Sequence, residues 1–166
     1  AETFMEAKET LGDYLGKNQI DNLVIFTHGN ADGGVIYPNG NTDQALKPQH
    51  INTYVTGRSR NIKGSGFGYE TIKALDGIVN YVKENGNVLF STCWACHGES
   101  GKSMASSLSR LTQQRVNLYL NQDPSMRRYY NGYVEIWTGK PLTSELREGW
   151  VKVDRSGSTL ELKGHE

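Results

Sequence analysis

Two short apolar runs, each followed within a few residues by a potentially catalytic side chain, constrain the possible fold of this chain more than any other feature. Residues 23–26 (LVIF) precede Thr27 and His28, and residues 88–90 (VLF) precede a Ser-Thr pair and Cys93. An uninterrupted apolar run with polar boundaries is typical of a strand buried on both faces, as in parallel sheets. The sequence therefore predicts two equivalent strands that end at His28 and Cys93.

The spacing of apolar residues around these runs predicts an alternation of helices and strands. Helices are expected before Gly16, from Ile72 to near Gly86, and from Ser103 to Gln113. Further strands are expected at 116–120 and 133–137, with a terminal hairpin at 150–153 and 159–162. Such alternation favours parallel strands joined by right-handed crossovers, and so an α/β fold with helices on both faces of the sheet.

A long segment of low apolar content separates the first strand from the helix that begins near Ile72. Residues 30–68 are rich in glycine, asparagine and proline, with turn signals at 32–34 and 38–40. The sequence predicts a long loop here. Long loops in compact domains often border binding clefts, and a surface excursion with short helical turns is the alternative.

The composition suits one domain that spans residues 1–166, since domains commonly hold roughly 100–200 residues. Basic and acidic residues number 18 each, so no net charge draws the chain to nucleic acid or to anionic lipid. No apolar stretch reaches the roughly 20 residues of a membrane span, and the N-terminal residues lack a signal-peptide pattern. We expect a soluble domain without nucleic-acid or membrane partners, and nothing in the sequence indicates its localisation or oligomeric state.

His28 and the cysteines are the candidate chemical residues. A thiol becomes a good nucleophile when an imidazole takes its proton, which requires the two groups to lie close together. If the two apolar strands are neighbours, the carboxyl ends of both bring His28 and Cys93 to one edge of the sheet. Gly29 follows the histidine directly, and its backbone N–H is a candidate donor to an oxyanion.

These two segments resemble the caspase-like (clan CD) cysteine peptidases, nearest to the clostripain-like and CHAT-type bacterial members. The family's pattern is an apolar strand followed by His-Gly, a crossover helix, and a second apolar strand followed by a small residue and Cys. The resemblance implies a three-layer α/β/α sandwich with a mainly parallel central sheet. It also implies hydrolysis of peptide bonds by a Cys-His dyad, with a protein or peptide substrate and no cofactor.

Either cysteine fits a family pattern. Residues 91–93 (STC) resemble the CHAT Ser-Ala-Cys pattern, whereas residues 95–98 (ACHG) resemble the caspase Ala-Cys-x-Gly pattern. Val88 and Cys93 are as many residues apart in the sequence as Leu23 and His28, so the expected strand lengths favour Cys93 as the nucleophile. Cys96 is the alternate nucleophile and otherwise a small packed hydrophobe, while a Cys93–Cys96 disulfide would be strained in an extended backbone.

Other functions use the same residues. Cys93-x-x-Cys96-His97 fits the c-type haem attachment pattern, and the pair also fits a thioredoxin-like redox motif. A zinc site would be crowded and would lack a matching second pair of ligands. The main alternative of another class is a catalytically inactive caspase-like interaction module, which would have no need of both His28 and a thiol.

The loop after the strand at 116–120 offers one carboxylate, Asp123. Acidic residues select basic side chains in several clostripain-like relatives, and the resemblance implies a substrate-binding role for Asp123 in cleavage after lysine or arginine. The alternative is a residue that caps the turn before Pro124.

Overall fold

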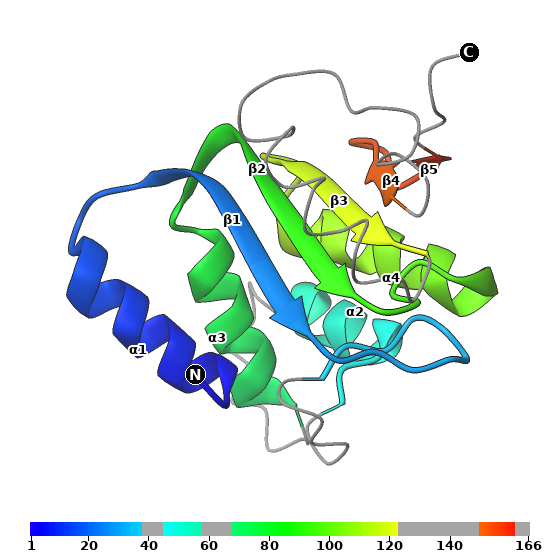
Figure 1. The fold of residues 1–166 in the computed structure, drawn as a ribbon, viewed down its shortest axis with the longest axis horizontal. Coiled ribbons are helices and arrows are strands. Elements are labelled where there is room, and N and C mark those ends of the chain that lie inside the picture. Colours follow the sequence, from blue (N-terminus) through cyan, green and yellow to red (C-terminus); the bar gives the residue numbers. More distant parts are fainter. Residues whose placement is uncertain (38–44, 58–67, 123–149, 162–166) are drawn as a thin grey trace.

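The computed structural model describes residues 1–37, 45–57, 68–122 and 150–161. Its helices and strands, in chain order, are α1 (Phe4–Leu15), β1 (Ile20–Thr27), α2 (Pro48–Gly57), α3 (Tyr69–Val79), β2 (Val82–Thr92), α4 (Gly98–Leu111), β3 (Asn117–Asn121), β4 (Trp150–Val153) and β5 (Thr159–Glu161). The strands form one sheet in the order β1-β2-β3-β4-β5 (Figure 1). The three longest strands, β1, β2 and β3, run parallel, and β4 and β5 are antiparallel additions. The predicted α/β class is confirmed.

The helices of the described segments pack on one face of the sheet. Phe4, Ile51, Leu75 and Met104, one from each helix, belong to a single buried cluster that also holds inward-facing residues of β1 to β4. Right-handed crossovers between strands that advance in one direction all fall on the same face, and the order β1-β2-β3 never reverses. This strand order explains the one-sided helix layer.

The opposite face of the sheet carries a smaller apolar cluster. Leu89 and Trp150 are buried there, with Val24 and Tyr119 packed against them, while Phe26 is 60% exposed. Within the described residues no helix covers this face, so the second helix layer of a three-layer sandwich stays a prediction.

The predicted long loop contains a helix. α2 begins at Pro48 and buries Ile51 completely. Proline is favourable at the first position of a helix, where its missing N–H has no partner to lose. The prediction of a loop over residues 30–68 is therefore wrong for residues 48–57, and residues 38–44 and 58–67 lie outside the described part of the chain.

The helix expected to end near Gly86 ends earlier. α3 stops at Val79, and the fully buried Val82 already begins β2 as the partner of Ile20. A side chain at Gly86 would place its Cβ 2.7 Å from the carbonyl oxygen of Asp21 in the preceding part of β1. Gly86 therefore permits a close approach between strands and does not cap a helix.

The remaining predicted elements form where the structure describes them, but the helix expected at 103–113 is α4, which begins earlier, at Gly98, and ends at Leu111. α1 ends at Leu15, and Gly16 closes it with a φ of 58°, a value that favours glycine. The terminal hairpin forms from β4 and β5, with its turn held by Asp154, whose carboxylate accepts hydrogen bonds from the backbone N–H groups of Ser156 and Ser158. The strand expected at 133–137 lies outside the described residues.

Candidate active site

β1 and β2 end side by side at one edge of the sheet. Thr27 and Thr92 are register partners at the ends of the two strands, and their buried hydroxyls share a hydrogen bond. His28 and Cys93 are the next residues of each chain. The structure thus places the predicted base and the predicted nucleophile at equivalent positions beyond two paired strands, although 65 residues separate the two threonines in sequence.

The side chains of His28 and Cys93 follow the alternation of the strands. Thr27 and Thr92 are buried beneath the sheet, whereas His28 is exposed and Cys93 is half-buried. Because successive side chains of a strand point to opposite faces, the residues after the threonines leave the helix-covered face. A substrate that reaches this edge would meet both groups from solvent.

Gly29 packs directly on the backbone of Cys93. A Cβ at Gly29 would lie 1.8 Å from the Cys93 carbonyl oxygen and 3.0 Å from the Cγ2 atom of Thr92. No side chain fits in that space. The glycine that follows the histidine therefore allows the two strand ends to approach each other.

The same close packing continues along the loop that follows His28. Gly33 and Gly34 have φ values of 83° and 66°, and a Cβ on either would meet a backbone oxygen of residues 97–100 at 2.1 or 2.3 Å. The Gly34 N–H donates a hydrogen bond to the Trp94 carbonyl over 3.2 Å. The predicted turn at 32–34 thus packs against the segment that carries both cysteines and is hydrogen-bonded to it.

Cys93 lies in a tight turn. The Ala95 N–H donates to the Thr92 carbonyl over 3.2 Å, which makes Cys93 and Trp94 the central residues. Trp94 has a φ of 55°, a conformation that costs a bulky residue about 1–3 kcal/mol and often occurs at functional sites. The turn ends the extended conformation of β2 directly after Thr92.

Asn121, at the end of β3, accepts two hydrogen bonds from residues that flank Cys93 in this turn. Its side-chain Oδ1 accepts a hydrogen bond from the Thr92 N–H at 3.0 Å, and its carbonyl accepts one from the Cys96 N–H at 2.9 Å. The residue is fully buried. These two bonds fix the chain on both sides of Cys93, a role that the sequence analysis did not assign to Asn121.

Cys93 and Cys96 occupy different environments. Both are thiols rather than a disulfide, but Cys96 is only 4% exposed and belongs to the main core cluster beside Ala95. A Cβ on Gly101 of α4 would lie 2.1 Å from the Cys96 carbonyl carbon, so the helix packs tightly over this residue. Cys96 has the surroundings of a packed small hydrophobe.

The burial of Cys96 bears on the cofactor readings of the Cys-x-x-Cys-His pattern. A thioether to a porphyrin would require the Cys96 sulfur to leave the core, which does not fit the packing between Ala95 and α4. His97, by contrast, is exposed at the N-cap of α4. Across the described segments, no three His, Cys, Asp or Glu side chains are grouped to hold a metal ion.

Tyr37 is the second residue of this region that the sequence analysis missed. It forms an antiparallel bridge with His28, stacks its ring on the imidazole, and donates its hydroxyl to the Gly29 carbonyl at 2.8 Å. No sequence signal pointed to it, because it lies between turn-forming segments without periodicity. Asp123, the predicted substrate-binding residue, lies outside the described residues.

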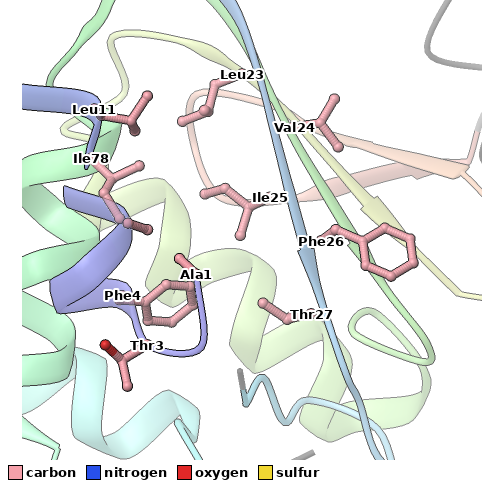
Figure 2. A pocket seen from close by; sticks show the side chains of 11 residues that line it. Ala1, Thr3, Phe4, Leu11, Leu23, Val24, Ile25, Phe26, Thr27 and Ile78 are labelled. Carbon is pink, nitrogen blue, oxygen red and sulfur yellow. The ribbon is translucent and has the colours of Figure 1, made fainter. Parts of the chain in front are cut away.

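A cavity of about 200 Å³ lies between α1 and β1 (Figure 2). Apolar side chains such as Phe4, Leu23, Ile25 and Ile78 line most of it. It extends to Thr27, the residue before His28, but neither a histidine nor a cysteine lines it, so the cavity borders the candidate active site and does not contain its chemical groups.

Comparisons with protein-family models, with curated proteins and with solved structures find no match to this chain. No helix in the described part of the chain combines the length and apolar character that crossing a membrane requires.

Proposed function

We propose that this chain is a cysteine hydrolase, a peptidase in which Cys93 is the nucleophile and His28 the base. The observation that carries the proposal is the shared end of β1 and β2, where the Thr27–Thr92 pair leaves His28 and Cys93 at equivalent positions. Gly29 in direct contact with Cys93 supports it. The three-layer caspase-like architecture is part of the same proposal.

In the proposed reaction, His28 takes the proton of the Cys93 thiol, and the thiolate attacks a peptide carbonyl carbon. The carbonyl oxygen becomes an oxyanion, which accepts a hydrogen bond from the Gly29 N–H. The C–N bond then breaks as His28 gives its proton to the leaving amine, and a thioester remains on Cys93. Water, deprotonated by His28, hydrolyses the thioester and restores the thiol. This chemistry needs no cofactor.

Cys93 is the preferred nucleophile because of its exposure. Cys93 is half-buried at the strand end, whereas Cys96 is enclosed by the core and by α4. A nucleophile must meet substrate, so Cys96 would need the turn and the helix to separate first.

Asp123 remains the proposed selector of basic side chains, and Asp123→Ala would then remove any preference for cleavage after lysine or arginine.

A covalent peptidyl electrophile tests the proposal. Incubation with a chloromethyl ketone that carries lysine at its reactive end is expected to add one peptidyl group, which mass spectrometry of the digested protein places on Cys93. Cys96→Ser, the matched control, should still be modified, and His28→Ala should react at least about a hundredfold more slowly. Modification on Cys96, or equal rates with and without His28, would reject the assignment.

The inactive interaction module remains the second candidate. The exposed Phe26 and the small apolar cluster on the face that no described helix covers favour it, since exposed apolar side chains often mark protein contacts. This module would show a Cys93 thiol no more reactive than that of an unstructured peptide.

A further inference from the structure

Tyr37 contacts His28 and Gly29, the two residues that assist the Cys93 thiol in the proposed reaction. Its ring stacks on the His28 imidazole, with 6.1 Å between ring centroids and 18° between planes. Its hydroxyl donates to the Gly29 carbonyl oxygen over 2.8 Å. One side chain thus restrains the orientation of the base and the conformation of the glycine beside it.

The backbone of Tyr37 adds a third restraint. The His28 N–H donates to the Tyr37 carbonyl at 3.0 Å, and the Tyr37 N–H donates to the His28 carbonyl at 3.2 Å. The His28 carbonyl and the Gly29 N–H belong to one trans peptide plane, in which they point in opposite directions. The Gly29 N–H therefore points away from Tyr37, and Gly29 packs on Cys93.

We propose that Tyr37 is a positioning residue for this site. Its ring holds the His28 imidazole in place for proton transfer. Its backbone bonds to His28 orient the Gly29 N–H, and its hydroxyl, bonded to the Gly29 carbonyl, fixes the peptide on the other side of the glycine, so that Gly29 stays where its N–H meets the oxyanion. The inference rests on the proposed hydrolase function and extends it to a residue outside the Cys-His-Gly set. Tyr37 is half-buried beside the exposed His28, which suits a residue that supports the base and leaves the exposed imidazole to meet the substrate.

The two roles of Tyr37 separate in two variants. Tyr37→Phe keeps the stacked ring and removes the hydrogen bond to Gly29, whereas Tyr37→Leu removes both. Alkylation by iodoacetamide reports the thiolate alone, because this displacement forms no oxyanion. Acylation by p-nitrophenyl acetate passes through a tetrahedral oxyanion and so reports the Gly29 N–H as well.

We expect Tyr37→Phe to slow acylation about tenfold, a fraction of what loss of an oxyanion donor costs, and to leave alkylation unchanged. Tyr37→Leu should slow both reactions and shift the alkylation rate profile toward the pH of a free thiol, about 8.5. Tyr54→Phe is the matched control, because it loses a hydroxyl bond to Asp76 at 2.7 Å in the helix layer. Both rates should stay at the wild-type value in that control.

Any other result for the two Tyr37 variants overturns the inference that Tyr37 positions the site. Unchanged rates in both Tyr37 variants, or an equal loss of both rates in Tyr37→Phe, would mean that Tyr37 only packs against the loop. A wild-type thiol that alkylates no faster than a free cysteine would reject the proposed function itself, and with it the role of Tyr37. The wild-type measurement thus separates failure of the site from failure of this residue.

Discussion

Gly29→Ala is expected to destabilise the domain by about 3 kcal/mol and to abolish the enhanced reactivity that we propose for the Cys93 thiol. The new methyl group would fall 1.8 Å from the Cys93 carbonyl oxygen, a backbone atom that cannot rotate away. The strand ends must therefore separate, and the separation moves His28 relative to Cys93. A free energy of unfolding from denaturant titration and an alkylation rate measure the two effects.

Gly12→Ala is the matched control for that substitution. Gly12 lies within α1, where a Cβ would meet only the end of the Tyr81 side chain at 3.0 Å. Alanine favours a helix interior by up to about 1 kcal/mol over glycine, so stability should hold or rise. Wild-type stability and wild-type reactivity in Gly29→Ala would show that the two strand ends do not meet as described.

Asn121→Leu is expected to lower the free energy of unfolding by about 2 kcal/mol and to slow alkylation of Cys93. Leucine has a similar size but no acceptor, so the buried Thr92 N–H loses its partner, which costs about 1–3 kcal/mol. Thr92, the residue before the proposed nucleophile Cys93, then loses the hydrogen bond that fixes its backbone. Denaturant titration and the rate of iodoacetamide alkylation, measured below the denaturation midpoint, follow both consequences.

Asn87→Ala provides a control at the other end of the same sheet. The Asn87 side chain donates to Asn22 at 2.8 Å and accepts from Asn117 at 3.1 Å, so it links β1, β2 and β3. We expect this variant to lose about 1 kcal/mol of stability and to keep the wild-type alkylation rate. Equal loss of reactivity in Asn87→Ala and Asn121→Leu would mean that reactivity follows global stability and not the Asn121 contact.

The two strands that position the site were predictable because each carries a continuous apolar run next to a polar residue that can take part in catalysis. The burial on both faces that such runs predict is found at the end of β2. It is wrong for β1, which lies at the edge of the sheet with Phe26 60% exposed. Parallel neighbours end at the same edge, so the sequence predicted that His28 and Cys93 lie close together on the condition that these two strands are neighbours, and the pairing of β1 with β2 meets that condition.

Features that depend on tertiary contacts were not predictable in the same way. α2 begins at a proline within a segment rich in turn signals, and the stability of that helix comes from burying Ile51 against the core. Gly86 was interpreted as a helix cap, although the approach of Asp21 from β1 is what requires a glycine there. Local patterns do not record which distant backbone comes close.

The supporting residues of the site were missed for a related reason. Asn121 acts through a buried amide that reaches the neighbouring strand, and Tyr37 acts through a bridge between loop segments. Neither residue type at these positions is distinctive in sequence. Their roles depend on β3 ending beside β2 and on the loop folding back along His28.

The central claim is that His28 activates the thiol of Cys93, and the rate of iodoacetamide alkylation as a function of pH tests it most directly. Wild type, His28→Ala, Cys93→Ala and Cys96→Ala are compared under native conditions. We predict fast alkylation with a half-maximal pH below about 8.5, lost in Cys93→Ala, retained in Cys96→Ala, and slow in His28→Ala. A slow thiol in every protein, or a fast one unaffected by His28→Ala, would contradict the account.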